Sequence, residues 1–317
     1  MIKSIVNVSE LEGAKRLDAE YYQPVFTQLA EYLRSIPNTK KLKVMLATPI
    51  HRGILPNYTD SGTVYVVKTD NVRNDFLIFD IPQFATDEFY RGKPRGRLKP
   101  YDVVMTSTGR GTLGRCNVFS EMFKAYADGH IAIIRPQANI LDPYFLYVFL
   151  ISKFGQFQIE RVYTGSTGQI EIYPEHINEF LIPCLNHDFQ QEVRQIAVQA
   201  HHLKRDSESL YLQAEQMLSD ELEWGKLDSS QPKSHTIPLS QANGVSRIDA
   251  EHFQPKYDKL LNHIKKMGKT DILEDVVLFN KRGVQPTYVK NGNVIVVNSQ
   301  HLGRYLLNVE ATERTNE

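Results

Sequence analysis

The chain has 317 residues, 41% of them hydrophobic, which is long enough for two domains with a sizeable core. Its formal net charge of +0 excludes a general attraction to nucleic acid or to an anionic membrane, so any basic surface must be local. Cys116 and Cys184 are expected to be reduced thiols. Without a signal-peptide core or an apolar run of membrane-spanning length, the sequence predicts a cytoplasmic protein with no membrane partner.

Short helices and strands alternate in the first half of the chain. Apolar residues at helical spacing predict helices over residues 25–35 and 143–152, the second opened by Asp142. Runs of β-branched residues between turns predict strands. These strands cover residues 64–69, 77–81, 102–105 and 130–135.

Five basic residues alternate with other residues in the segment 91–99. If the segment is extended, all five lie on one side and form a stripe that faces phosphates. Its glycines and prolines favour a solvated loop equally well. The five residues are Arg91, Lys93, Arg95, Arg97 and Lys99.

A Gly-rich segment, residues 106–115, follows the strand predicted at 102–105. Its glycines let the backbone approach a partner closely, and its side chains can donate to phosphates or guanine edges. It lacks the Gly-Lys-Ser/Thr of a P-loop, and its G-x-G-x-x-G letters lack the acidic residue and strand–helix–strand context of a dinucleotide site. In a second Gly-rich turn, 163–169, Ser166 lacks the glycine spacing of a nucleophile elbow. The donors of the first segment are Thr108, Arg110, Thr112 and Arg115.

A heptad pattern runs through residues 187–224, with apolar residues at alternating steps of four and three. At 1.5 Å per residue this helix would be roughly 50 Å long, and its seam needs a partner helix. The adjacent His201 and His202 point to different faces, so no metal site is predicted. A polar linker is expected at 225–236. The seam residues are Phe189, Val193, Ile196, Leu203, Leu210 and Met217.

Two blocks of the sequence recur further along the chain. RLDAEYYQP, which contains Arg16, recurs around Arg247, and HRGILPNYTDSGTVYVV, which contains Arg52, recurs around Arg282. A repeat of this length is a whole domain. Within it, the acidic pair of the first block lies beside a helix start, which favours capping or a pair with Arg16 over acid–base catalysis. The predicted order is a first domain at 1–186, the helix at 187–224, the linker at 225–236 and a second domain at 237–317, which is expected to be incomplete.

This order resembles the specificity subunit of type I restriction-modification systems. The resemblance rests on RLDAEYYQP, on LKPYDVVMTSTGRGTLGRC and on TGSTGQIEIYPEHINEFLIPCL, which leads into the heptad helix. It implies an α+β, strand-rich target-recognition domain, then a coiled-coil helix, then the start of a second, repeated recognition domain. It also implies a non-catalytic, cofactor-free subunit that binds double-stranded DNA and directs methyltransferase (M) subunits and a restriction/translocase (R) subunit to the target.

The resemblance assigns the DNA contacts to the basic stripe, the Gly-rich segment and the turn after residue 67. Cations of the stripe would hold phosphates, and the other side chains would meet base edges. The helix would be a spacer of roughly 15 base pairs at 3.4 Å each, and it would pair with another chain as a homodimer or stay partly exposed. The expected DNA contacts are Lys68, Asp70, Lys93, Arg95, Arg97, Thr108, Arg110, Thr112 and Arg115.

Two other functions fit the same residues. A heptad helix between end domains also suits a coiled-coil scaffold that binds protein. The chain also suits the recognition end of a fused restriction–methylation enzyme whose catalytic motifs lie outside this sequence. Salt dependence of DNA binding separates the scaffold from the DNA-binding proteins, because neutralised phosphates release counterions.

Overall fold

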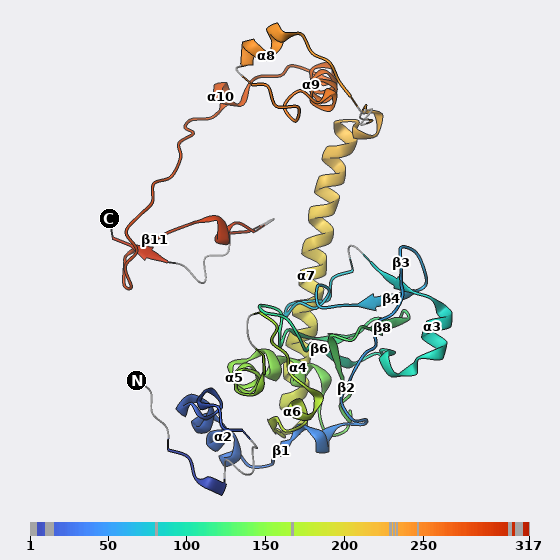
Figure 1. Cartoon of the computed structure of the whole chain (residues 1–317), viewed down its shortest axis with the longest axis vertical. Helices are drawn as coiled ribbons and strands as arrows, with labels where there is room; N and C mark the ends of the chain where they lie inside the picture. The colour runs from blue at the N-terminus through green and yellow to red at the C-terminus, as the bar shows by residue number, and fades with distance from the viewer. Residues whose placement is uncertain are drawn as a thin grey trace. The chain divides into compact units, whose positions relative to one another are not determined.

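The chain folds as two compact units that separate between Gln213 and Ala214. The structure is a computed structural model, shown in Figure 1. The helix α7 (His187–Glu221) contains the boundary between the two units. No helix in the described ranges is long and apolar enough to cross a membrane. The structure describes residues 5–9, 16–79, 82–165, 168–227, 230, 232, 234–245, 247–303, 306–307 and 313–316.

A four-stranded antiparallel sheet lies at the centre of the first unit (Figure 1). Successive side chains of a strand point to opposite faces, so Val103 and Met105 lie in one core and Val104 in another. Both faces of the sheet are therefore covered. In spatial order the strands are β2 (His51–Arg52), β9 (Ile131–Ile134), β6 (Asp102–Thr106) and β7 (Cys116–Phe119).

A second four-stranded sheet covers one of those faces. Its strands β4 and β8 pair in parallel, whereas its other neighbours pair antiparallel. Val67 and Ala127 of this sheet share a core with Val104 and Ile133 of the first. In spatial order the strands are β3 (Tyr58–Thr59), β5 (Phe84–Ala85), β4 (Val64–Val67) and β8 (Ala125–Ala127).

Helices cover the other face of the central sheet. The helix α4 is apolar on all sides and mostly buried. Its Leu146 shares one core with Met105 of β6 and with Ala197 of α7, so both elements pack around the helix. Asp142 caps α4, accepting hydrogen bonds from two backbone N–H groups of its first turn at 2.8 and 3.2 Å. This layer contains α2 (Pro24–Ser35), α4 (Pro143–Ile151), α5 (Lys153–Val162), α6 (Pro174–Asn178) and the ribbon of β1 (Thr39–Lys41) with β10 (Leu181–Pro183).

The first half of α7 packs against this domain through one of its faces. Gln190 and Ala197 are buried, and the Gln190 side-chain oxygen accepts a hydrogen bond from the backbone N–H of Asp142 at 2.8 Å. Arg194 pairs with the Asp142 carboxylate at 2.9 Å. These contacts join the helix to the end of α4 at which Asp142 lies.

The predicted α+β fold with a long helix is confirmed, and most predicted elements are present. The strand predicted at 77–81 is wrong. Leu77 makes a single bridge to Val72, and residues 80 and 81 lie outside the described ranges. The segment folds back because the Asn71 side chain accepts from the Lys68 backbone N–H and donates to a carbonyl further on, both at 2.8 Å.

The second unit repeats local features of the first. Arg247 makes two hydrogen bonds to Asp249, at 2.7 and 2.9 Å, just as Arg16 makes two to Asp18. The Asp18 carboxylate therefore pairs with an arginine and does not cap the turn η1 (Ala19–Tyr22) that follows it. The elements of this unit are α8 (Leu239–Val245), α9 (Pro255–Met267), α10 (Leu273–Val276), β11 (Val294–Ile295) and β12 (Arg314–Thr315).

Candidate nucleic-acid interface

The Gly-rich segment forms a closed loop between β6 and β7. At its base the Gly114 backbone N–H donates to the Thr106 carbonyl and the Thr106 N–H donates to the Arg115 carbonyl, both at 2.9 Å. Gly109 and Gly111 lie at φ +98° and +81°, in the left-handed region that favours glycine. The glycines thus allow a tight loop to project from a buried sheet.

The second Gly-rich segment holds this loop from the side. The Gly109 N–H donates to the Ile170 carbonyl at 3.0 Å, and the Ile172 N–H donates to the Ser107 carbonyl at 2.9 Å. Gly165 lies at φ +111°, and a Cβ there would lie 2.1 Å from the Gln169 carbonyl oxygen. Ser166 lies outside the described residues. The two segments, predicted separately, therefore form one backbone assembly.

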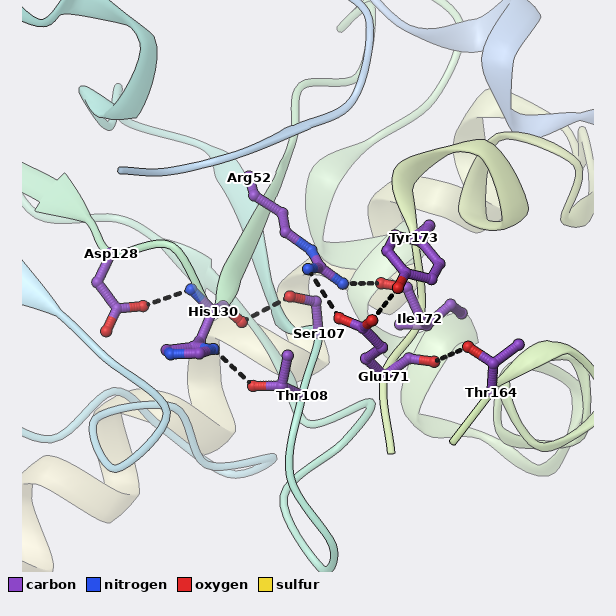
Figure 2. A network of polar contacts seen from close by, with 9 residues as sticks. All are labelled: Arg52, Ser107, Thr108, Asp128, His130, Thr164, Glu171, Ile172 and Tyr173. Carbon is purple, nitrogen blue, oxygen red and sulfur yellow. Dashed lines mark hydrogen bonds and ion pairs between the residues drawn. The ribbon is translucent and has the colours of Figure 1, made fainter. Parts of the chain in front are cut away.

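Arg52 fixes the second segment in place, as Figure 2 shows. Its guanidinium donates to the Glu171 carboxylate at 3.1 Å and to the Ile172 carbonyl at 2.7 Å. The cation also lies 5.0 Å from the centre of the Tyr173 ring, whose hydroxyl bonds to Glu171. Sequence reasoning missed this role, although the recurrence of Arg52 in the repeat was a signal for it.

A polar cluster of Thr108, His130 and Asp128 lies on the other side of the loop (Figure 2). The Thr108 hydroxyl lies 2.9 Å from His130 Nδ1. Asp128 is 3% exposed, and burial raises its pKa. Its carboxylate accepts from the backbone N–H of His130 at 2.8 Å and not from the ring, so the three residues do not form the proton relay of a nucleophile triad. The cluster positions the loop.

Two residues named with the loop from the sequence lie beside this cluster. Lys68 lies with its ammonium 5.5 Å from the centre of the Tyr58 ring. The Tyr58 hydroxyl donates to Asp128 at 3.4 Å, and burial, helped by that carboxylate, raises the pKa of Tyr58 to about 12. Asp70 lies in the turn after β4. Its negative charge favours the protonated form of Arg115 and so raises the pKa of that guanidinium, against a larger lowering by burial. The end of β4 and the Gly-rich loop thus share one surface.

The four donors predicted within the loop have different surroundings. Arg110 is exposed at the tip, and no described residue pairs with it. Thr112 turns inward, its hydroxyl donating to the Thr108 carbonyl at 2.9 Å. Thr108 binds His130, as above, and Arg115 is partly buried. Arg110 is therefore the donor most available to a ligand.

Of the two alternatives that the sequence left open for residues 91–99, a loop and an extended basic stripe, the extended stripe is wrong. The segment forms the end of α3 (Asp87–Gly92) and the turn η3 (Pro94–Gly96), because Thr86 caps α3 and Pro94 suits the first position of the turn. Arg97 donates to the Tyr90 carbonyl at 2.6 Å and lies 4.8 Å from its ring centre, so it holds this fold together. Lys93 and Arg95 are exposed.

The seam of α7 faces away from the domain for most of its length. Ile196, Leu203 and Leu210 are 69, 61 and 64% exposed, and Phe189 and Met217 are also exposed. Val193 packs partly against the core, and the Phe189 ring lies edge-on to the core residue Phe145, with ring centres 6.4 Å apart. A mostly apolar groove of about 650 Å³ opens beside it; its lining includes Tyr147, Val148, Val193, Ile196, Ala197 and Ala200.

Neither a protein-family model nor a curated protein matches the sequence. Among solved structures, a type I restriction-modification system described for its complex assembly and conformational transition matches with 15% identity and a TM-score of 0.37, over 66% of this chain and 53% of that chain. The type I specificity subunit from M. genitalium matches with 14% identity and a TM-score of 0.35, over 61% of this chain and 44% of that chain. The type IIG restriction endonuclease BpuSI matches with 12% identity and a TM-score of 0.40, over 60 and 30%. The chain thus spans about half of the first two matched chains or less.

No group of three or more His, Cys, Asp or Glu residues within the described ranges could hold a metal ion. Cys116 is buried, and burial strongly raises the pKa of its thiol, so this cysteine is held as an inert core residue. The interface offers hydrogen-bond donors and positive charge on a rigid loop. That chemistry suits binding of an anion or of a base edge.

Proposed function

We propose that the chain is a sequence-specific DNA-recognition subunit of a type I restriction-modification complex. The observation that carries the proposal is Arg110, exposed at the tip of a loop whose base is fixed by backbone hydrogen bonds on two sides. An arginine on a rigid projection can make a bidentate contact with a guanine edge in the major groove, worth about 1–3 kcal/mol of discrimination. The family resemblance of the sequence supports the same function.

In this proposal the chain recognises the target and its partners perform the chemistry. Thr108, His130 and Asp128 are arranged to hold a loop and not to move a proton along a relay. Methyltransferase subunits and a restriction/translocase subunit would supply methylation and cleavage. Lys68, Lys93 and Arg95 would contribute phosphate contacts that fix the register of the domain on the duplex.

Replacing Arg110 tests the proposal. Arg110→Ala should weaken binding to the target duplex about 10- to 100-fold and relax the recognised sequence, because one bidentate contact is lost. Electrophoretic mobility shift with target and scrambled duplexes measures both effects. Arg34→Ala, an exposed arginine of α2, is the matched control and should leave binding unchanged. Equal loss on both duplexes would make Arg110 a phosphate contact, and no loss would remove it from the interface.

A coiled-coil scaffold is the second candidate, favoured by the exposed seam of α7. DNA recognition predicts that duplex affinity falls steeply with salt, whereas a scaffold predicts no duplex binding. Co-purification with a methyltransferase subunit, followed by mapping of the methylated adenines, separates a subunit from the recognition fragment of a fused restriction–methylation enzyme.

A further inference from the structure

The turn that follows β4 has a self-contained backbone frame. The Asn71 side chain accepts from the Lys68 N–H at 2.8 Å, and Val72 bridges Leu77. Inside the bridge the Arg73 N–H donates to the Phe76 carbonyl at 3.1 Å. These bonds use backbone atoms and one asparagine, so the frame does not need the Arg73 side chain.

This frame is tied to β7 and α4. The Asn117 amide donates to the Arg73 carbonyl at 3.0 Å, and the Asn74 side chain accepts from the Cys116 N–H at 3.1 Å. The Tyr147 hydroxyl of α4 donates to the Asn74 carbonyl. Arg73 is therefore held at a fixed place next to the residues at the start of β7.

Arg115 directly precedes β7, so it lies next in the chain to Cys116, whose N–H donates to the residue after Arg73, and the two arginines stand on adjoining backbone segments. The pKa of Arg115 is lowered, first by burial and then by the positive charge of Arg73. The negative charge of Asp70 raises this pKa, but by less than burial and Arg73 lower it. No carboxylate in the described ranges forms an ion pair with Arg73 or Arg115, and Arg115 Nη1 is buried without an acceptor. Two cations on adjoining backbone segments, neither of them paired with a carboxylate of the described residues, form a site that an anion would stabilise.

The second unit builds the same frame with different side chains. There Leu302 bridges Leu307, and the Gly303 N–H donates to the Leu306 carbonyl at 3.0 Å. The strand pair that encloses this turn has the same register as in the first unit, with Val294 opposite Thr315 as Val64 is opposite Ala85. Gly303 occupies the place of Arg73, so the arginine is dispensable for the turn. Its presence in the first unit calls for a role outside folding.

We propose that Arg73 and Arg115 together bind one backbone phosphate of the DNA duplex, next to the Gly-rich loop. This proposal rests on the proposed function. The phosphate oxygens accept hydrogen bonds from both guanidinium groups and neutralise their repulsion. Arg115 is thereby a phosphate contact and not the base-edge contact expected from the sequence, while Arg110 keeps that position. The first unit holds this contact and the second unit, with Gly303, does not.

Two probes test the site in the full chain with the variants Arg73→Gln, Arg115→Gln and the double variant. Inorganic phosphate should raise the unfolding midpoint of the wild type, and this rise should be lost in each variant but kept in Arg34→Gln. On mixed-sequence duplex DNA, Arg73→Gln should reduce the slope of log affinity against log salt by about 0.9, the value for one phosphate contact. The double variant should lose no more slope than one single variant, because both arginines bind the same phosphate.

Two further readouts separate binding from folding. Without phosphate, Arg73→Gln should unfold at the same midpoint as the wild type or higher, because a repulsion is removed; a lower midpoint would make Arg73 a structural residue and overturn the proposal. Unchanged salt slopes, or additive losses in the double variant, would also overturn it. If the wild type binds no duplex at all, the proposed function fails, and the phosphate arm then decides by itself whether an anion site exists.

Discussion

Gly114 lies at the end of the Gly-rich loop, where any other residue would have a strained backbone and a Cβ in contact with a neighbouring side chain. It lies at φ +78°, and a Cβ there would lie 2.9 Å from Ile159 Cδ1. Gly111 in the same loop lies at φ +81° with nothing within 4 Å. The pair separates the cost of a left-handed backbone from the cost of a clash with α5.

Replacing these glycines should therefore have graded effects. Gly111→Ala should lower the free energy of unfolding by about 1–2 kcal/mol through backbone strain alone, and Gly114→Ala by about 2–4 kcal/mol, because Ile159 must also move. Chemical denaturation measures both. Gly92→Ala in α3, where a Cβ meets nothing within 4 Å, is the control and should cost nothing. Equal losses at 111 and 114 would show that Ile159 adjusts freely.

The carboxylate of Asp142 joins two helices. One oxygen caps α4, and the other accepts from Arg194 of α7 at 2.9 Å. The residue is buried, so these hydrogen bonds replace the water that its oxygens would otherwise contact. The long helix is thus joined to the sheets and helices of the first unit by a cap that the sequence already indicated.

Removing this carboxylate should loosen both helices. Asp142→Ala should lower the free energy of unfolding by about 2–4 kcal/mol, because a cap contributes about 1 kcal/mol and Arg194 loses a buried partner. Urea titration followed by circular dichroism measures the change. The control is Gln23→Ala, since Gln23 precedes α2 without a side-chain cap bond. A loss no larger than that of the control would contradict the joint role of Asp142.

Elements whose signal is local were predictable from the sequence. The helix α4 has an N-cap aspartate, a proline at its first position and apolar residues throughout. The buried strand β6 is a short β-branched run between turns, and α7 has a sustained heptad pattern. Each depends on neighbours a few residues away, so a single sequence is enough to find it.

The hydrogen bonds of individual polar side chains were not predictable in this way, even where the partner is only a few residues away. The strand expected at 77–81 gives way to a turn because one asparagine, Asn71, offers the backbone other hydrogen bonds. Of the predicted DNA contacts, Arg97 and Thr112 use their donors within the fold. Arg73, which was not singled out, is bonded through its carbonyl to Asn117 of β7, the strand that Arg115 precedes. Alternation and residue type say nothing about such pairings.

The two faces of α7 differ in burial: one packs against the first unit and the other is exposed. One face is covered by the sheets and helices of the first unit through Gln190, Arg194 and Ala197. The seam residues Ile196, Leu203 and Leu210 are more than half exposed, so their apolar area is left to a partner. A heptad repeat of this kind buries its large residues against another helix. We propose that this partner is a second helix of the same type, in a second copy or in the assembled complex.

Two charges on the seam should abolish that association. Leu203→Glu with Leu210→Glu should weaken self-association at least about 100-fold, since burying each leucine contributes roughly 1.5–3 kcal/mol and a symmetric pair buries each twice. The variant should keep the unfolding midpoint of an isolated chain, because these side chains are exposed there. Sedimentation velocity over a range of concentrations measures the association. Leu212→Glu, at an exposed leucine off the seam, is the matched control and should associate like the wild type. Two results together would contradict this proposal: a wild type that stays monomeric, and a double variant that co-purifies with a methyltransferase subunit as well as the wild type does. The seam would then have no partner, and the scaffold candidate would fail too.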